Sequence, residues 1–244
     1  MIRHSSFAAT FKKLLGAAAV GAALCATSAA QAGTLDFEAP VDSPYIFAGD
    51  VVTVGNYVVE GYGLQGPDGT PGLVGSISNT EGCFGVQCPI NNAGTYYSGL
   101  ADGYMAFHRV DGGLFSIGTL DASFIGLGET YPALAGLLYI TGFDATGIVA
   151  EIFLNLAGPT NGNFSFASYD LTGFGGGALF TDVRIASYAC DANGDCNRET
   201  NQANFAIDNI VTIDAAGDVP EPGTFALMGL GLLGLGAFSR RRAA

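Results

Sequence analysis

Hydrophobic and polar residues alternate along most of the chain between residues 34 and 213, in short runs rich in β-branched and aromatic side chains. This period of two is typical of half-buried β-strands, because successive strand side chains point to opposite faces of a sheet. No amphipathic helical stripe interrupts the alternation. The runs that predict strands are residues 34–38, 50–54, 57–60, 104–108, 114–117, 122–127, 137–143, 148–156, 163–171, 179–187 and 205–213.

Glycine, proline and asparagine separate these runs and mark turns. The turn signals are Gly61-Tyr62-Gly63, Pro67-Asp68-Gly69, Asn161-Gly162 and the glycine-rich run 173–177. Roughly ten to twelve short strands at such spacing predict an all-β fold, a two-sheet β-sandwich. Residues 64–103 carry few strand signals, so we expect a long loop that lies over one face or edge of the sandwich.

An apolar segment before the alternating region belongs to targeting rather than to the fold. Its parts are a basic start with Arg3, Lys12 and Lys13, an apolar stretch 14–26, and the small-x-small sequence Ala30-Gln31-Ala32. This order predicts a helical signal peptide that signal peptidase removes during secretion. Cleavage after Ala32 makes Gly33 the first residue of the mature chain.

The C-terminal end also has three parts in order. Pro220-Glu221-Pro222 ends the preceding domain, because proline cannot continue a helix or a central strand. Residues 224–238 are uncharged and apolar, and Arg240, Arg241 and Arg242 follow. They predict a short transmembrane helix of about 22 Å, less than the roughly 30 Å hydrocarbon core, with the arginines on the cytoplasmic side. We therefore expect a weak or temporary hold on the membrane.

The order of Pro-Glu-Pro, short apolar span and basic cluster resembles the PEP-CTERM sorting signal of Gram-negative bacteria. The resemblance implies processing by an exosortase in the inner membrane, then delivery to the cell surface or the extracellular space. Together, the two terminal patterns divide the chain into a signal peptide (1–32), a β-sandwich domain (33–218) and a sorting signal (219–244). The PEP-CTERM resemblance implies where the protein is delivered and leaves the function of the β-sandwich domain open.

The exported part of the chain is strongly acidic. Its basic residues are Arg109, Arg184 and Arg198, and three arginines against 22 acidic residues between Asp36 and Glu221 leave a balance of −19. Such a charge repels phosphate backbones, so we expect no nucleic-acid partner. Solubility outside the cytoplasm explains the charge, and binding of divalent cations is the alternative.

Four cysteines remain after removal of the signal peptide, namely Cys83, Cys88, Cys190 and Cys196. Among three possible connectivities, the short spacings favour local disulfides within each close pair, as expected of an exported protein. A zinc site with four thiolates is the alternative, but the Cys-x2-Cys spacing common in such sites is absent.

The first and last strands of the domain resemble those of exported jelly-roll domains. The opening strand reads Leu35-Asp36-Phe37-Glu38, and the closing segment reads Asn204-Phe205-Ala206-Ile207-Asp208-Asn209-Ile210. The closing segment is similar to a QFxxD-type motif of some PEP-CTERM proteins, with Asn204 in the place of glutamine. The resemblance implies a jelly-roll-like sandwich similar to carbohydrate-binding modules.

In such modules a structural calcium ion often lies where the terminal strands meet. By position, the resemblance implies Glu38 and Asp208 as calcium ligands, with Asp36 as a weaker candidate. From the residues alone, a solvated strand end, or the capping of a bulge together with Asn209, explains Asp208 as well. Asp191-Ala192-Asn193-Gly194-Asp195 has part of the spacing of a calcium loop, but a tight Asn-Gly turn closed by a disulfide explains it better.

Catalytic residue types are scarce in the mature region. His108 is its one histidine, followed by Arg109 and close to Asp111, and the region holds no lysine and no Gly-x-Ser-x-Gly elbow. The glycine run 173–177 lacks the lysine and the following helix of a phosphate loop. We therefore expect no enzyme, although the many carboxylates leave a secreted glycoside hydrolase as a third reading.

Sugar binding is a further possibility, because aromatic rings flanked by polar groups stack against sugars. The tyrosines considered are Tyr96, Tyr97, Tyr104, Tyr169 and Tyr188. Tryptophan is absent and most of these tyrosines are expected inside the sandwich, so none is assigned as a ligand. The sequence thus predicts a structural or adhesive protein of the cell surface or biofilm matrix. A calcium-stabilised carbohydrate-binding module that contacts exopolysaccharide is the alternative.

Overall fold

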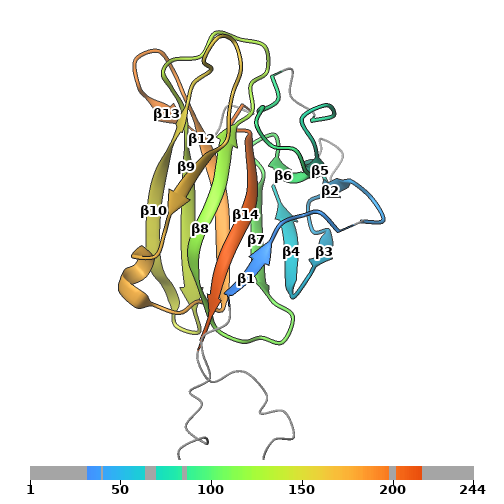
Figure 1. The fold of residues 1–244 in the computed structure, drawn as a ribbon, viewed down its shortest axis with the longest axis vertical. Helices are drawn as coiled ribbons and strands as arrows, with labels where there is room; N and C mark the ends of the chain where they lie inside the picture. Colours follow the sequence, from blue (N-terminus) through green and yellow to red (C-terminus); the bar gives the residue numbers. More distant parts are fainter. Residues whose placement is uncertain (1–31, 40, 64–69, 84–86, 198–201, 216–244) are drawn as a thin grey trace, which may run out of the picture. The chain divides into compact units, whose positions relative to one another are not determined.

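Two antiparallel sheets pack face to face in the computed structural model, which describes residues 32–39, 41–63, 70–83, 87–197 and 202–215 (Figure 1). The predicted signal peptide and sorting segment lie outside these residues, apart from Ala32. The described part contains no helix with the length and apolar character to cross a membrane. In chain order, the elements are β1 (Ala32–Leu35), β2 (Tyr45–Phe47), β3 (Val51–Val54), β4 (Tyr57–Tyr62), β5 (Leu73–Ser78), β6 (Tyr96–Gly99), β7 (Tyr104–Arg109), β8 (Phe115–Phe124), β9 (Leu134–Asp144), β10 (Gly147–Ala157), β11 (Ala167–Asp170), the 3₁₀ turn η1 (Phe174–Gly177), β12 (Asp182–Cys190), β13 (Cys196–Asn197) and β14 (Phe205–Asp214).

The first sheet has the order β11-β8-β14-β6-β5-β2, with β1 also paired to β14. The second sheet has the order β10-β9-β12-β7-β4-β3, with β13 beside β12. Most neighbours in a sheet are distant in sequence, as in jelly-roll-like sandwiches, and the prediction of an all-β sandwich is confirmed.

Aromatic side chains from the inner faces fill the space between the sheets. The ring centroids of Phe107 on β7 and Phe115 on β8 lie 5.5 Å apart. Tyr57 on β4 meets both rings edge-on at 5.9 and 5.7 Å. Each such ring, once buried, contributes roughly 1.5–3 kcal/mol to the free energy of unfolding. The Tyr57 hydroxyl also lies 2.5 Å from the hydroxyl of Thr212 on β14, so one buried hydrogen bond joins the two sheets.

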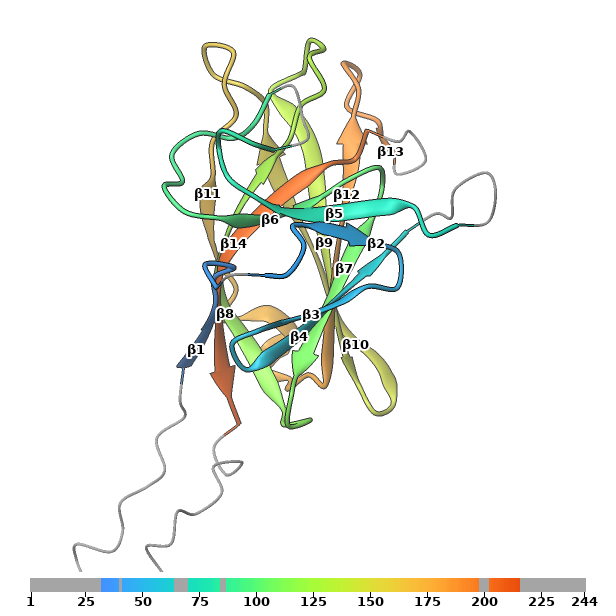
Figure 2. The ribbon, with the colours of Figure 1, turned by 90° about the vertical axis from the view of Figure 1, so that its right-hand side faces the viewer.

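The first and last strands pair with each other. Ala32 lies opposite Ile213, and Leu35 lies opposite Ile210. The described chain therefore begins and ends at the same end of the sandwich, at the bottom of Figures 1 and 2.

The prediction of a long loop over residues 64–103 is wrong, because this segment contributes β5 and β6 to the first sheet. All four residues of β6 are buried, and the strand lies between β14 and β5. A glycine within each strand weakened the sequence pattern by which the strand could have been predicted. A Cβ at Gly75 would lie 2.5 Å from the Tyr97 hydroxyl, and one at Gly99 would lie 2.1 Å from the ring of Phe205. Glycine here provides room for neighbouring aromatic rings rather than a turn.

The turn predicted at Gly61-Tyr62-Gly63 is also wrong, because Gly61 and Tyr62 continue β4. A Cβ at Gly61 would lie 2.5 Å from Ile46 Cγ2, so this glycine allows a close approach to β2. The predicted runs 114–117 and 122–127 form parts of one strand, β8, which ends at Phe124. The Asn161-Gly162 turn is confirmed, with φ of 53° and 80°. The Pro67-Asp68-Gly69 signal lies outside the described residues.

Candidate functional site

Asp208 lies on β14, where an irregularity of the strand follows it. The pairing of β14 with β8 shifts between Asp208 and Val211, and Asn209 has a φ of 50°. Asp208 is 2% exposed. Asp208 is therefore not a solvated residue at a strand end. A buried carboxylate needs hydrogen-bond partners or a counter-ion.

The two carboxylate oxygens of Asp208 have different surroundings. The side-chain amide of Asn92 donates a 2.7 Å hydrogen bond to Oδ2. Oδ1 is buried and has no hydrogen-bond partner among the described residues. Burial raises the pKa of Asp208 to about 6; the Asn92 hydrogen bond and the backbone N–H of Asn209 oppose this shift, and the charges of Glu38 and Asp121 add to it. A negative charge on Asp208 is thus only partly compensated.

Glu38 approaches the same loop from the end of the first strand. The predicted strand 34–38 stops at Leu35, and Phe37 adopts a φ of 53°. The backbone N–H of Thr95 donates to Glu38 Oε1 at 3.0 Å, and the Thr95 hydroxyl donates to the Phe37 carbonyl at 2.6 Å. Gly94 makes this possible, because a Cβ there would lie 1.7 Å from Glu38 Oε1.

The loop that contains Asn92 and Thr95 therefore brings together the two residues that the sequence suggested as calcium ligands. Next to it lies an open hollow of about 320 Å³, whose lining includes Asn92, Asp121 and Asn209. The carboxylate of Asp36, the weaker candidate, accepts the backbone N–H of Glu38 at 3.3 Å.

The oxygen atoms around Asp208 are of the type that a hard cation prefers as ligands, but they are few. Calcium prefers carboxylate and carbonyl oxygens, and the buried Oδ1 of Asp208 is an oxygen in need of a partner. Within the described residues, no three carboxylate, histidine or cysteine side chains gather as a metal-binding group. Glu38 and Asp208 would thus hold a calcium ion together with neutral oxygens. Such an ion would supply the positive charge that this junction lacks.

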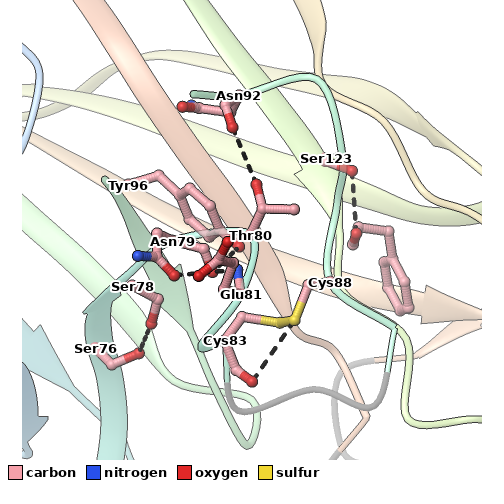
Figure 3. Close-up of a disulfide and its surroundings, with 11 residues drawn as sticks. Ser76, Ser78, Asn79, Thr80, Glu81, Cys83, Cys88, Asn92, Tyr96 and Ser123 are labelled. Atoms are coloured by element: carbon pink, nitrogen blue, oxygen red, sulfur yellow. Dashed lines mark hydrogen bonds between the residues drawn. A yellow bond between two sulfur atoms is a disulfide. The ribbon is translucent and has the colours of Figure 1, made fainter. Parts of the chain in front are cut away.

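A disulfide lies in the segment that precedes the loop of Asn92. Cys83 and Cys88 are joined, and Cys190 and Cys196 form a second bridge, so both predicted pairs are confirmed. Figure 3 shows the first bridge close to Thr80, whose hydroxyl donates a 3.0 Å hydrogen bond to the Asn92 carbonyl. Thr80, which precedes Cys83, therefore contacts the backbone of the residue whose side chain donates to Asp208.

Within the turn closed by the Cys190–Cys196 disulfide, the polar groups form hydrogen bonds with one another. Asp191 Oδ1 accepts the backbone N–H groups of Asn193 at 2.8 Å and Asp195 at 2.9 Å. These bonds lower the pKa of Asp191, with the Asp195 N–H as the largest cause. The carboxylate therefore stabilises a tight turn, as the sequence analysis favoured over a calcium loop.

His108 and Arg109 occupy the end of β7. Arg109 forms a bidentate pair with Asp111 at 2.9 and 2.6 Å, and its Nη1 lies 2.6 Å from Asp214 Oδ1 on β14. These contacts connect the ends of strands in opposite sheets, which is a structural role. His108 is half-buried and lies opposite Val58 on β4.

The predicted processing sites lie at the borders of this domain. Ala32 and Gly33, on either side of the predicted cleavage, are the first residues of β1. Pro220, Glu221, Pro222 and the three arginines lie outside the described residues. Residues 218–242 nevertheless match the family model of the PEP-CTERM protein-sorting motif. The chain carries this sorting motif. The motif implies processing by an exosortase and export to the cell envelope.

Comparison with solved structures concerns the fold. A DUF4465 family protein from Bacteroides caccae superposes with a TM-score of 0.51 at 12% identity, over 75% of this chain and 99% of that one. A family 11 carbohydrate-binding module from Clostridium thermocellum gives a TM-score of 0.24 at 12% identity, over 71% of this chain and 96% of that one. No curated protein sequence matches the chain significantly. At 12% identity, the similarity to the DUF4465 family protein supports the sandwich fold and says nothing about function.

Several residues of the site were not found from the sequence. Asn92, Thr95 and Asp121 come from a loop and a strand far from Asp208 in sequence, and no local pattern singles them out. Among the tyrosines considered, Tyr96 and Tyr97 are fully buried. Tyr104 and Tyr188 are half-buried on the second sheet.

Proposed function

We propose that the protein is an exported, non-enzymatic β-sandwich with a structural or adhesive role at the cell surface or in the extracellular matrix of a Gram-negative bacterium. The sorting motif at residues 218–242, directly after a domain with two disulfides, carries this proposal. Its route includes a temporary stay in the inner membrane. Disulfides suit an oxidising compartment, which lies outside the cytoplasm.

The pairing of β1 with β14 brings both ends of the described chain to one end of the sandwich. In sequence, the two targeting segments continue from these ends.

The test is the location of the protein in cells that contain an exosortase. We expect the parent chain on the cell surface or in the medium, and a Pro220→Ala/Pro222→Ala variant retained in the inner-membrane fraction. A surface fraction that is equal for both would contradict the sorting step. Turnover of a glycan by the purified protein, abolished by one carboxylate substitution, would replace the structural role with that of a hydrolase.

We further propose that Glu38 and Asp208 bind a calcium ion that stabilises the junction of the terminal strands. The buried, unpartnered Oδ1 of Asp208, beside the charge of Glu38, supports this proposal. Calcium titration of the mature protein by calorimetry and thermal melting tests it. We expect calcium to raise the melting temperature of the parent and not of Asp208→Asn. Asp170→Asn, an exposed aspartate on β11, is the matched control and should respond like the parent. No response in the parent would remove calcium from the proposal.

A further inference from the structure

A transverse row of aromatic side chains crosses the outer face of the second sheet. Tyr62 on β4 lies opposite Tyr104 on β7, and Tyr139 on β9 lies opposite Phe153 on β10. Between the two pairs runs β12, where Ala186 lies opposite Tyr139. The pairing of β12 with β7, continued by one residue, brings Ala186 beside Tyr104. The row therefore reads aromatic, aromatic, alanine, aromatic, aromatic.

The two aromatic pairs are stacked. The rings of Tyr62 and Tyr104 lie 5.0 Å apart at 9°, and those of Tyr139 and Phe153 lie 4.6 Å apart at 20°. Tyr188 meets Tyr139 and Phe153 edge-on at 6.2 and 5.8 Å. Since one face of Tyr104 and one of Tyr139 are taken by their stacking partners, their opposite faces lie on the side of β12.

A hollow of about 250 Å³ lies where these opposite faces meet β12. Tyr104 and Tyr139 line it, and Ala186 is part of its floor. Strands in a sheet are about 4.8 Å apart, so the two tyrosines stand roughly 10 Å apart across β12. A slot of this width between two aromatic faces accommodates one puckered, saturated ring, which is thicker than a flat aromatic ring. The small side chain at Ala186 keeps the slot open.

A second row of polar side chains runs beside the aromatic row. Arg184 lies opposite Thr141, and Thr141 lies opposite Glu151. The hydroxyls of Tyr62 and Tyr139 donate to the carboxylates of Glu60 and Glu151. Arg184 donates to Asp182 at 3.1 Å, and its guanidinium lies 4.3 Å from the centre of the Phe143 ring. These contacts hold charged groups in place next to the slot, where they can accept and donate hydrogen bonds.

The charges of this face indicate the kind of occupant. Glu60, Glu151 and Asp182 lie on this face with Arg184 and His108, on a domain that is itself strongly acidic. Anionic polymers are repelled by such a surface. A neutral sugar ring offers C–H groups to the aromatic faces and hydroxyls to the carboxylates and the guanidinium. We propose that this slot binds a neutral polysaccharide, with one pyranose ring between Tyr104 and Tyr139.

The proposal names a ligand class for the adhesive role proposed above and rests on that role for its biological meaning. The two are tested separately. Export depends on the sorting motif, whereas sugar binding depends on the second sheet and is measured with the purified mature protein. Variants in the slot should still be exported in the localisation experiment.

The test is affinity gel electrophoresis in neutral polysaccharides (a mixed-linkage β-glucan, hydroxyethylcellulose and a galactomannan), with alginate as an anionic polymer. We expect retardation by at least one neutral polymer and none by alginate. Tyr139→Ala and Tyr104→Ala should each weaken binding about tenfold, as lost stacking of about 1.4 kcal/mol implies. Ala186→Phe should also abolish retardation, although it adds an aromatic ring, because it fills the slot.

Tyr45→Ala, on β2 of the other sheet, is the matched control and should bind like the parent. Melting curves of every variant show whether it folds, and the two tyrosine variants keep the test valid if Ala186→Phe is unstable. Equal retardation of the parent, Tyr139→Ala and Ala186→Phe would overturn the proposal. So would retardation by alginate alone, no retardation of the parent by any neutral polymer, or a dimer of the parent that Ala186→Phe dissociates.

Discussion

Asp121 on β8 and Asp208 on β14 are direct cross-strand partners in the first sheet. Like charges in such positions destabilise a sheet. Asp121 is compensated by the Ser168 hydroxyl and by the side-chain amide of Asn209 at 2.9 Å. Asp208 has the Asn92 amide on one oxygen and no described partner on the other. The pair therefore concentrates negative charge next to Glu38, at the junction of the terminal strands.

With a chelator present, we expect the stability of the mature protein to decrease as the pH rises from about 4 to 7. Burial raises the pKa of Asp208 to about 6 from an ordinary 3.8, so the folded state keeps a proton that the unfolded state has already lost. This contribution is complete below the unfolded pKa and is lost as the pH passes the folded one, at most about 3 kcal/mol. Asp208→Asn should flatten this dependence in melting experiments, and an unchanged slope in the variant would contradict it.

The two disulfides should differ in their effect on calcium binding. Each closes a short loop, so its removal is expected to cost about 2 kcal/mol of stability, or several degrees in melting temperature. Cys83→Ser/Cys88→Ser should also weaken the response to calcium, because it frees the segment after Thr80, whose hydroxyl donates to the Asn92 carbonyl. Cys190→Ser/Cys196→Ser is the control and should keep the response. Equal responses in both variants would show that the first bridge does not position the site.

Gly99→Ala should destabilise the domain by about 1–3 kcal/mol, because an added Cβ would lie 2.1 Å from Cε1 of Phe205 and overpacks the core. Gly118→Ala on β8 is the matched control, since the nearest atom to its Cβ is 3.5 Å away. Urea unfolding of both variants measures the difference. A loss of stability at Gly118 as large as at Gly99 would contradict the steric argument.

Arg109→Met should destabilise the domain by about 1–3 kcal/mol, more than Arg184→Met. The Arg109 side chain is 11% exposed and contacts two carboxylates, whereas that of Arg184 is 49% exposed and contacts Asp182. The guanidinium lowers the pKa of Asp111 to about 2, so the pair stays charged at ordinary pH. Denaturant unfolding at pH 7 compares the two variants, and equal losses would contradict a special role for Arg109.

Local patterns predicted the parts of the fold in which neighbours in sequence decide the outcome. The alternation at residues 137–143 and 148–156 corresponds to β9 and β10, which form a hairpin with extensive pairing. The spacings of the cysteines predicted both bridges correctly. β5 and β6 escaped prediction because Gly75 and Gly99 interrupt their patterns, and the aromatic rings that require those glycines come from other strands.

The candidate site could be predicted only in outline. Glu38 and Asp208 were named by resemblance, and the structure places both against the loop of Asn92 and Thr95. The burial of Asp208 was not foreseen, because an aspartate near a strand end is usually exposed.

By itself, the sequence determined the two-sheet β-sandwich, the local disulfides and the sorting motif, because each depends on a periodicity or spacing within a short segment. The tertiary structure alone decided which strands are neighbours and in which register. That register places Asp208 opposite Asp121 and aligns Tyr104, Ala186 and Tyr139 in one row. A shift of one residue in any of these strands would turn its side chains to the other face, so the packing of distant strands brings together the residues of both proposed sites.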